Sequence, residues 1–185
     1  MPIRSGLRLL CLLPLACAGL LTAREARADV ASWLFVGGGA SAMSERGKSY
    51  ELRPNMQIDL GMGSSMAQPL VVGGLVRATP YFGQGVDLGL ALRLATQGFA
   101  VGKWGVALDA GGYQRWWGMG STGGIASVQL GAPYGVTLSL NATFGSDEHR
   151  VFGAVIGVDL LRLTVNRLGG ESWWYNPRPA WRPGT

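Results

Sequence analysis

The stretch that most constrains this chain runs from Gly85 to Thr96 and reads GVDLGLALRLAT. Large aliphatic side chains occupy every second position from 86 to 94, and small or charged residues fill the positions between them. Such alternation places the two kinds of side chain on opposite faces of a β-strand. At a helical period the leucines would spread around the helix and leave Asp87 without a polar side. The pattern therefore predicts a strand with one purely aliphatic face.

The same period of two recurs along most of the chain. Further strands are predicted over 55–62, 71–79, 103–111, 126–130, 136–144 and 152–160. A first strand is predicted over 31–42, but three consecutive glycines follow its apolar run and leave its faces unassigned. After position 160 the apolar phase shifts by one residue, which predicts a β-bulge. The 30 glycines of the chain also disfavour helices, because an interior glycine costs a helix roughly 1 kcal/mol.

The connections between these eight strands are too short for crossover helices. Longer polar connections at 44–49, 115–124 and 145–150 alternate with the connections at 63–69, 96–98 and 131–135, and a tight turn lies at 83–85. Short connections join antiparallel neighbours. The expected fold is all-β, an eight-stranded antiparallel up-and-down barrel of the transmembrane type.

The first 28 residues have the pattern of an export signal peptide. Arg4 and Arg8 form a basic start, residues 9–21 are apolar, and Ala26-Arg27-Ala28 matches a small-x-small cleavage site. The apolar run is shorter than the ~20 residues that a helical span needs. We therefore expect residues 1–28 to be a signal peptide, 29–167 a barrel, and 168–185 a Trp- and Pro-rich tail.

Removal of this leader changes what the chain can bind. Both cysteines, Cys11 and Cys17, lie within it, so the remaining 157 residues could form no disulfide and no thiolate site. The alternative is lipidation at Cys17, since Leu15-Ala16-Cys17 resembles a bacterial lipobox. The leader also holds four of the 16 basic and one of the 11 acidic residues, which leaves 12 and 10. We expect no nucleic-acid partner, because that requires clustered Lys and Arg.

The polar face of the strands indicates which side is inside. A soluble surface is normally ~25–35% charged, whereas this face carries about one charge per strand among small residues. Small polar side chains suit the crowded interior of an eight-stranded barrel. Four acidic and four basic residues would share this interior and neutralise each other: Asp59, Arg77, Asp87, Arg93, Lys103, Asp109, Asp159 and Arg162.

The aliphatic face would then meet lipid, in strands whose lengths approach the ~9–11 residues of a tilted transmembrane strand. The residues expected to face lipid are Leu88, Leu90, Leu92, Val106, Leu108, Leu138, Leu140 and Ile156. Many aromatic residues fall near strand ends, where membrane barrels carry aromatic girdles.

Residues 30–167 resemble the small eight-stranded outer-membrane barrels of the OmpA, OmpX and OmpW type. The resemblance covers the signal peptide, strand number, alternation and turn lengths. It implies a Gram-negative outer membrane, surrounding lipid and insertion by the outer-membrane assembly machinery. Barrels of this group usually end at an aromatic residue, whereas this chain continues with LGGESWWYNPRPAWRPGT.

Function is less constrained than fold. We expect a monomer with a structural or interaction role, no large pore, no metal or cofactor, and no enzymatic activity. A protein partner in the periplasm or outside the cell could bind the outer loops or the tail, through Trp173, Trp174, Tyr175 and Trp181. The alternatives are a soluble lipocalin-like barrel that binds a small ligand, and a lipid-modifying enzyme. For catalysis the only histidine, His149, has just adjacent loop residues as partners, a poor geometry for a triad.

Overall fold

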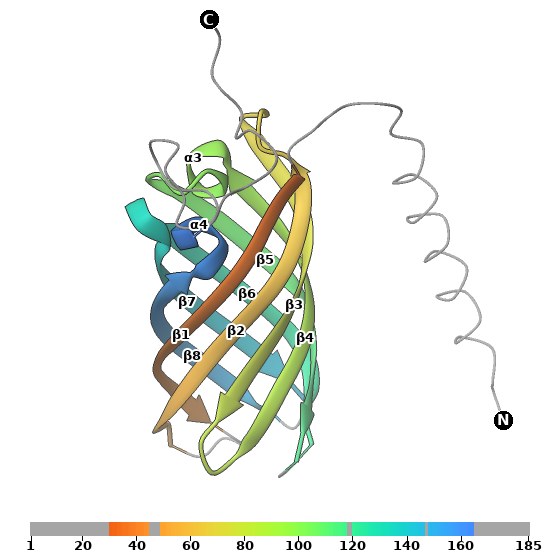
Figure 1. The fold of residues 1–185 in the computed structure, drawn as a ribbon. Helices are drawn as coiled ribbons and strands as arrows, with labels where there is room; N and C mark the ends of the chain where they lie inside the picture. The colour runs from red at the N-terminus through yellow and green to blue at the C-terminus, as the bar shows by residue number, and fades with distance from the viewer. Residues whose placement is uncertain (1–29, 45–48, 118–119, 147, 165–185) are drawn as a thin grey trace, which may run out of the picture.

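A computed structural model describes residues 30–44, 49–117, 120–146 and 148–164, and it is a closed antiparallel β-barrel (Figure 1). Each strand pairs with its neighbours in chain order, and β1 also pairs with β8 to close the barrel. This confirms the predicted all-β, eight-stranded up-and-down fold. The strands are β1 (Val30–Ser44), β2 (Glu51–Ser65), β3 (Leu70–Tyr81), β4 (Gly85–Thr96), β5 (Gly105–Trp116), β6 (Thr122–Gly131), β7 (Val136–Gly145) and β8 (Arg150–Asp159).

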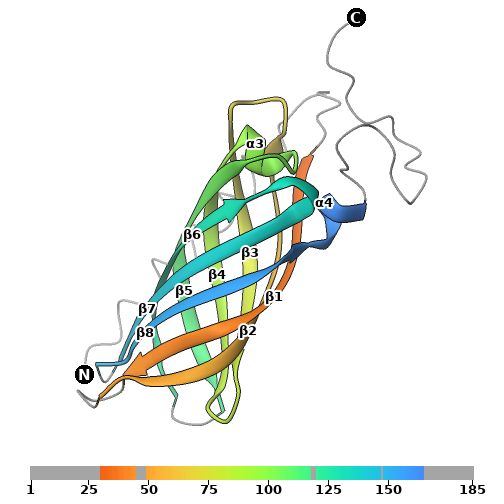
Figure 2. The same cartoon turned by 90° about the vertical axis from the view of Figure 1, so that its left-hand side faces the viewer.

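The two ends of the barrel differ. Three short helical turns gather at one end, which we call the helix end: α3 (Gln97–Ala100), η1 (Pro133–Gly135) and α4 (Leu160–Thr164) (Figure 2). At the other end, which we call the loop end, β1, β3, β5 and β7 finish and β2, β4, β6 and β8 begin. The expected leader and tail, including Trp173, Trp174, Tyr175 and Trp181, lie outside the described residues.

Inward and outward faces follow one parity throughout the barrel. Apart from Ser44 at the end of β1, every buried residue in a strand has an odd number. This assigns the first strand, whose faces the sequence left open: Trp33 and Phe35 point inward, and Leu34 and Val36 point outward. The antiparallel register keeps the parity from strand to strand, because one face must stay on the same side of the sheet.

Two sequence expectations fail at the helix end. The predicted bulge in the last strand is wrong, since β8 stops at Asp159 and α4 follows it directly. The Asp159 Oδ1 atom accepts hydrogen bonds from the backbone amides of Leu161 (3.1 Å) and Arg162 (3.2 Å), as an N-cap residue does. The cap redirects the chain over the barrel end, and this explains the shift in apolar phase.

The second failure concerns Lys103, which was expected inside the barrel. The chain forms α3 and a turn before β5 begins at Gly105, so Lys103 precedes the strand and its side chain is exposed. From α3 it is Phe99 that enters the barrel, with 1% of its surface exposed.

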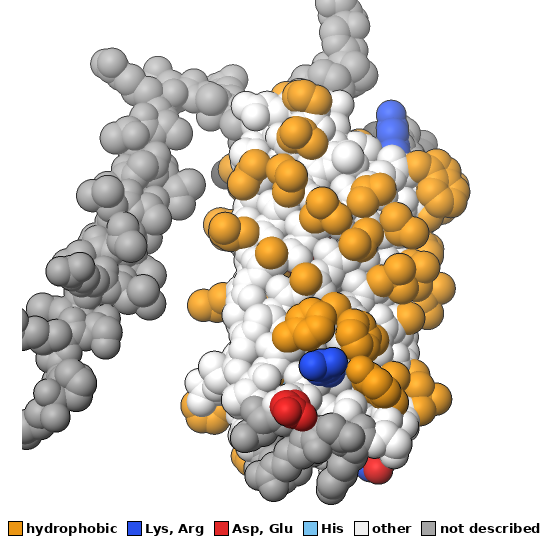
Figure 3. All heavy atoms as spheres, turned by 180° about the vertical axis from the view of Figure 1, so that it is seen from behind, with side chains coloured by type: hydrophobic (Ala, Val, Ile, Leu, Met, Phe, Trp, Pro, Cys, Tyr) orange, Lys and Arg blue, Asp and Glu red, His pale blue; other side chains and the backbone are white. Residues whose placement is uncertain are grey.

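Hydrophobic side chains are distributed over the exterior of the barrel wall, and most of them are aliphatic (Figure 3). Leu90 and Leu92, for example, are 69% and 71% exposed. Every residue predicted to face outward is exposed: Leu88, Leu90, Leu92, Val106, Leu108, Leu138, Leu140 and Ile156. Among the described residues, exposed charged side chains lie only at the two ends of the barrel: Glu51, Lys103, Glu148 and Arg150. No helix in the described part of the chain is both long and apolar enough to span a membrane.

Candidate functional site: the polar interior

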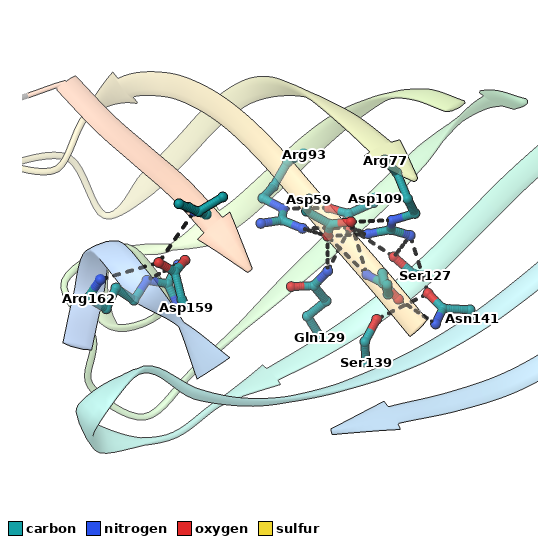
Figure 4. A network of polar contacts seen from close by, with 12 residues as sticks. Asp59, Arg77, Arg93, Asp109, Ser127, Gln129, Ser139, Asn141, Asp159 and Arg162 are labelled. Atoms are coloured by element: carbon teal, nitrogen blue, oxygen red, sulfur yellow. Dashed lines mark hydrogen bonds and ion pairs between the residues drawn. The ribbon is translucent and has the colours of Figure 1, made fainter. Parts of the chain in front are cut away.

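A cluster of four charged residues fills the middle of the barrel (Figure 4). It joins Asp59 from β2, Arg77 from β3, Arg93 from β4 and Asp109 from β5. Asp59 is paired directly with Arg77, and Arg93 with Asp109, across neighbouring strands. The sheet register thus places each arginine beside a carboxylate on the interior face.

The contacts of this central cluster are short and reciprocal. Arg77 donates to Asp59 through Nε (2.7 Å) and Nη2 (2.8 Å), and its Nη2 also donates to Asp109 (2.6 Å). Arg93 donates to Asp109 through Nε (2.7 Å) and Nη2 (2.9 Å), and its Nη2 reaches Asp59 at 3.1 Å. Both arginines therefore bridge both carboxylates. Such mutual neutralisation is what makes four buried charges tolerable in one site.

Neutral polar side chains complete the central cluster. Ser127 donates to Asp109 (2.8 Å), and the Gln129 amide donates to both carboxylates, at 3.0 and 3.2 Å. Arg77 Nη1 donates to Ser127 (2.9 Å) and to Asn141 (3.2 Å). The polar residues of β6 and β7 thus meet the charges contributed by β2 to β5, and the cluster connects six of the eight strands across the interior.

A second ionic pair lies nearer the loop end. Arg115 in β5 donates to Asp87 in β4 through Nε (2.6 Å) and Nη2 (2.9 Å), a bidentate arrangement. Its guanidinium also lies 5.1 Å from the ring centre of Tyr81. Arg115 falls in the connection predicted over 115–124, yet it lies in β5, and its odd number matches the inward parity of Asp109 and Tyr113.

His149 lies beside this pair rather than in solvent. It is 3% exposed, and burial, followed by the nearby Arg115 charge, lowers the pKa of His149 below its ordinary value of 6.5. The Asp87 carboxylate, which opposes that shift, is already held at both oxygens by Arg115.

The helix end holds a looser pair, Asp159 and Arg162. Arg162 Nε is 3.5 Å from Asp159 Oδ2, and the guanidinium stacks 3.9 Å from the ring centre of Phe99. The Arg93 guanidinium lies 5.6 Å from the ring centre of Phe99 and 5.1 Å from that of Trp33. Burial lowers the pKa of Arg162 to about 10, with Asp159 opposing and Arg93 adding to that shift.

Seven of the eight charged residues expected in the interior are buried there, and Lys103 is not. Arg115 takes its place, so the described interior still balances four aspartates against four arginines. They form the central cluster and two flanking pairs along the barrel. Among the described residues, no group of three or more metal-ligating side chains comes together.

Neither the protein-family models, the curated proteins nor the solved structures compared with this chain gave a match.

Proposed function

We propose that this chain is a monomeric barrel of a Gram-negative outer membrane, with a structural or interaction role and no large pore. The observation that carries the proposal is the inverted polarity of the barrel: four ion-paired arginines inside, and an uncharged aliphatic belt outside. A soluble barrel would need the opposite arrangement, because apolar surface exposed to water is unfavourable. A membrane barrel has an outward apolar band and a polar interior.

Exposed aromatic residues support this placement. In and beside β5, Trp104 and Trp116 are 76% and 49% exposed and lie at opposite ends of the strand. Twelve residues at ~3.3 Å each span about 40 Å along the strand. A strand tilt of ~45° reduces this to about 28 Å across the barrel, close to the ~25–30 Å apolar thickness of a bilayer. The two tryptophans are thus spaced as interfacial anchors.

The interior argues for a passive role. The central cluster joins residues of β2 to β7 in the middle of the barrel, and a barrel of eight strands has room for side chains rather than for an aqueous channel. A lipocalin-like protein would need an apolar cavity for its ligand, whereas the middle of this interior is filled by hydrogen-bonded polar groups and the apolar side chains at the helix end pack against one another. The carboxylates of Asp59, Asp87 and Asp109 all accept charge-assisted hydrogen bonds from arginine, which suits structure better than nucleophilic or acid–base chemistry.

The partners follow from this role. The exterior would contact outer-membrane lipid, and insertion would depend on the outer-membrane assembly machinery. A protein partner would meet the loop end, where Trp117, Phe82 and Tyr50 are 73%, 53% and 52% exposed, or the tail. We propose the loop end as the extracellular side, because a chain exported from the cytoplasm would leave both barrel termini in the periplasm.

Fractionation of a Gram-negative host that expresses the full chain tests the proposal. We expect the protein in the outer-membrane fraction, resistant to alkaline carbonate, with a gel mobility that changes on boiling as the barrel unfolds. A periplasmic barrel of known solubility serves as the control. Recovery of folded protein in the detergent-free soluble fraction would contradict the proposal.

A further inference from the structure

A small cavity lies between the central cluster and the Asp87–Arg115 pair. The cavity volume is about 20 Å³, and ~10–15 Å³ is enough to hold one water. Its lining comes from strands on several sides of the barrel, and it includes the polar side chains of Asn55, Arg77, Tyr81, Asp87, Tyr113 and Thr143.

The side-chain carbonyl oxygen of Asn55 lacks a hydrogen-bond donor. Asn55 Nδ2 donates to Ser41 Oγ at 2.8 Å, but Oδ1 makes no hydrogen bond although the residue is only 3% exposed. A buried acceptor without a donor is unfavourable, and such atoms in proteins are generally satisfied by ordered water. Asn55 also lines the cavity, so the space and the unmet hydrogen bond occur together.

The surrounding charges select the occupant. A cation would lie close to Arg77, which lines the cavity, and to Arg115, which holds Asp87. An anion would lie close to the Asp87 carboxylate and would offer no proton to Asn55 Oδ1. Water is neutral and can both donate and accept. It would also satisfy the Asn55 amide if its oxygen and nitrogen were exchanged, since water could then accept from Nδ2.

We propose that this cavity is a hydration site, holding one or two ordered water molecules hydrogen-bonded to Asn55. Because Arg77 and Asp87 both line the cavity, this water would lie between the central cluster and the Asp87–Arg115 pair. This inference goes beyond the proposed function, because the site depends only on the barrel interior and holds in a membrane or in water.

The test is a crystal structure of the full-length chain folded in detergent, at a resolution that shows ordered water. We expect density at a hydrogen-bond distance of ~2.7–3.2 Å from the Asn55 amide, and loss of that density in an Asn55→Leu variant. Thr137→Val, which alters a buried hydroxyl in β7 outside this lining, is the matched control and should keep the water.

Radiolytic footprinting provides a second readout if the leucine variant does not fold. Water held in the cavity should make Tyr81 and Tyr113 of the wild type react, although both are 5% exposed or less. A Thr143→Val variant should lose part of that labelling. An empty cavity in the wild type, a protein donor on Asn55 Oδ1, or a metal ion at a shorter distance would each overturn the proposal. None of these results would depend on where the fractionation places the protein.

Discussion

The central cluster and the Asp159–Arg162 pair both bury arginine beside aspartate, yet they satisfy it differently. Arg93 in the cluster makes three hydrogen bonds to carboxylate oxygens, between 2.7 and 3.1 Å. Arg162 is as deeply buried, but its Nε and Nη2 make no hydrogen bond. The nearest carboxylate oxygen, Asp159 Oδ2, is 3.5 Å from Arg162 Nε. Burial of charge costs free energy in both places, and only the cluster offsets it with close contacts. The comparison indicates that the cluster organises the barrel, whereas α4 is held by weaker interactions.

Removal of one arginine from the cluster should have the largest effect. We expect Arg93→Met to lower the free energy of unfolding by about 3–5 kcal/mol, because Asp59 and Asp109 would then share a single buried cation. Urea titration in detergent micelles, followed by gel mobility, measures this change. Arg53→Met is the matched control: Arg53 pairs with Glu51 at the partly exposed end of β2, and its loss should change stability by less than about 0.5 kcal/mol. Similar losses of unfolding free energy in both variants would contradict the claim that the central cluster contributes more to stability than a surface ion pair.

Double-mutant cycles sharpen the comparison by isolating each pair. We expect a coupling free energy of about 2 kcal/mol or more between Arg93 and Asp109, and about 0.5 kcal/mol between Arg162 and Asp159. The difference follows from two contacts under 3 Å in one pair and none in the other. Equal coupling energies would show that the longer distance has no energetic meaning.

Loss of Arg162 itself should be mild. We expect Arg162→Met to cost about 1 kcal/mol or less, because Asp159 keeps hydrogen bonds from the backbone amides of Leu34, Leu161 and residue 162. Asp159→Ala, which removes the cap of α4, should cost about as much or slightly more. The same urea titration measures both variants, and a loss for Arg162→Met as large as for Arg93→Met would contradict the ranking.

The smallest expected effect is a pH dependence at the loop end. The folded-state pKa of His149 lies below the 6.5 of an exposed histidine, so the unfolded chain takes up a proton first as the pH falls. The folded state should therefore lose stability from about pH 7 downward until the folded histidine is also protonated. A His149→Gln variant should show less of this loss in urea titrations between about pH 7.5 and pH 5. If the wild type instead gained stability relative to the variant as the pH fell through this range, the predicted direction of the pH dependence would be wrong.

The sequence predicts the strands and the direction of their side chains better than it predicts strand ends and contacts across the barrel. Period-two alternation predicted the barrel and most inward-facing charges, because parity is fixed along each strand. It did not predict where strands begin and end: Lys103 continues the parity of β5 but precedes it, and Arg115 extends the parity into a segment rich in aromatics and glycine. The shift after Asp159 was compatible with a bulge or a helical turn, and only the cap geometry distinguishes them. Contacts across the barrel depend on register and shear, which alternation does not contain.

The central claim, that the uncharged belt faces lipid, is tested most directly by arginine substitutions along β4 in lipid vesicles. Positions 86, 88, 90, 92 and 94 all lie on the outward side of this strand. We predict a cost that peaks at about 2–4 kcal/mol for Leu90→Arg or Leu92→Arg and falls to about 0–1 kcal/mol toward Val86 and Leu94. A flat profile near zero, as expected for leucines on a surface that faces water, would contradict the account.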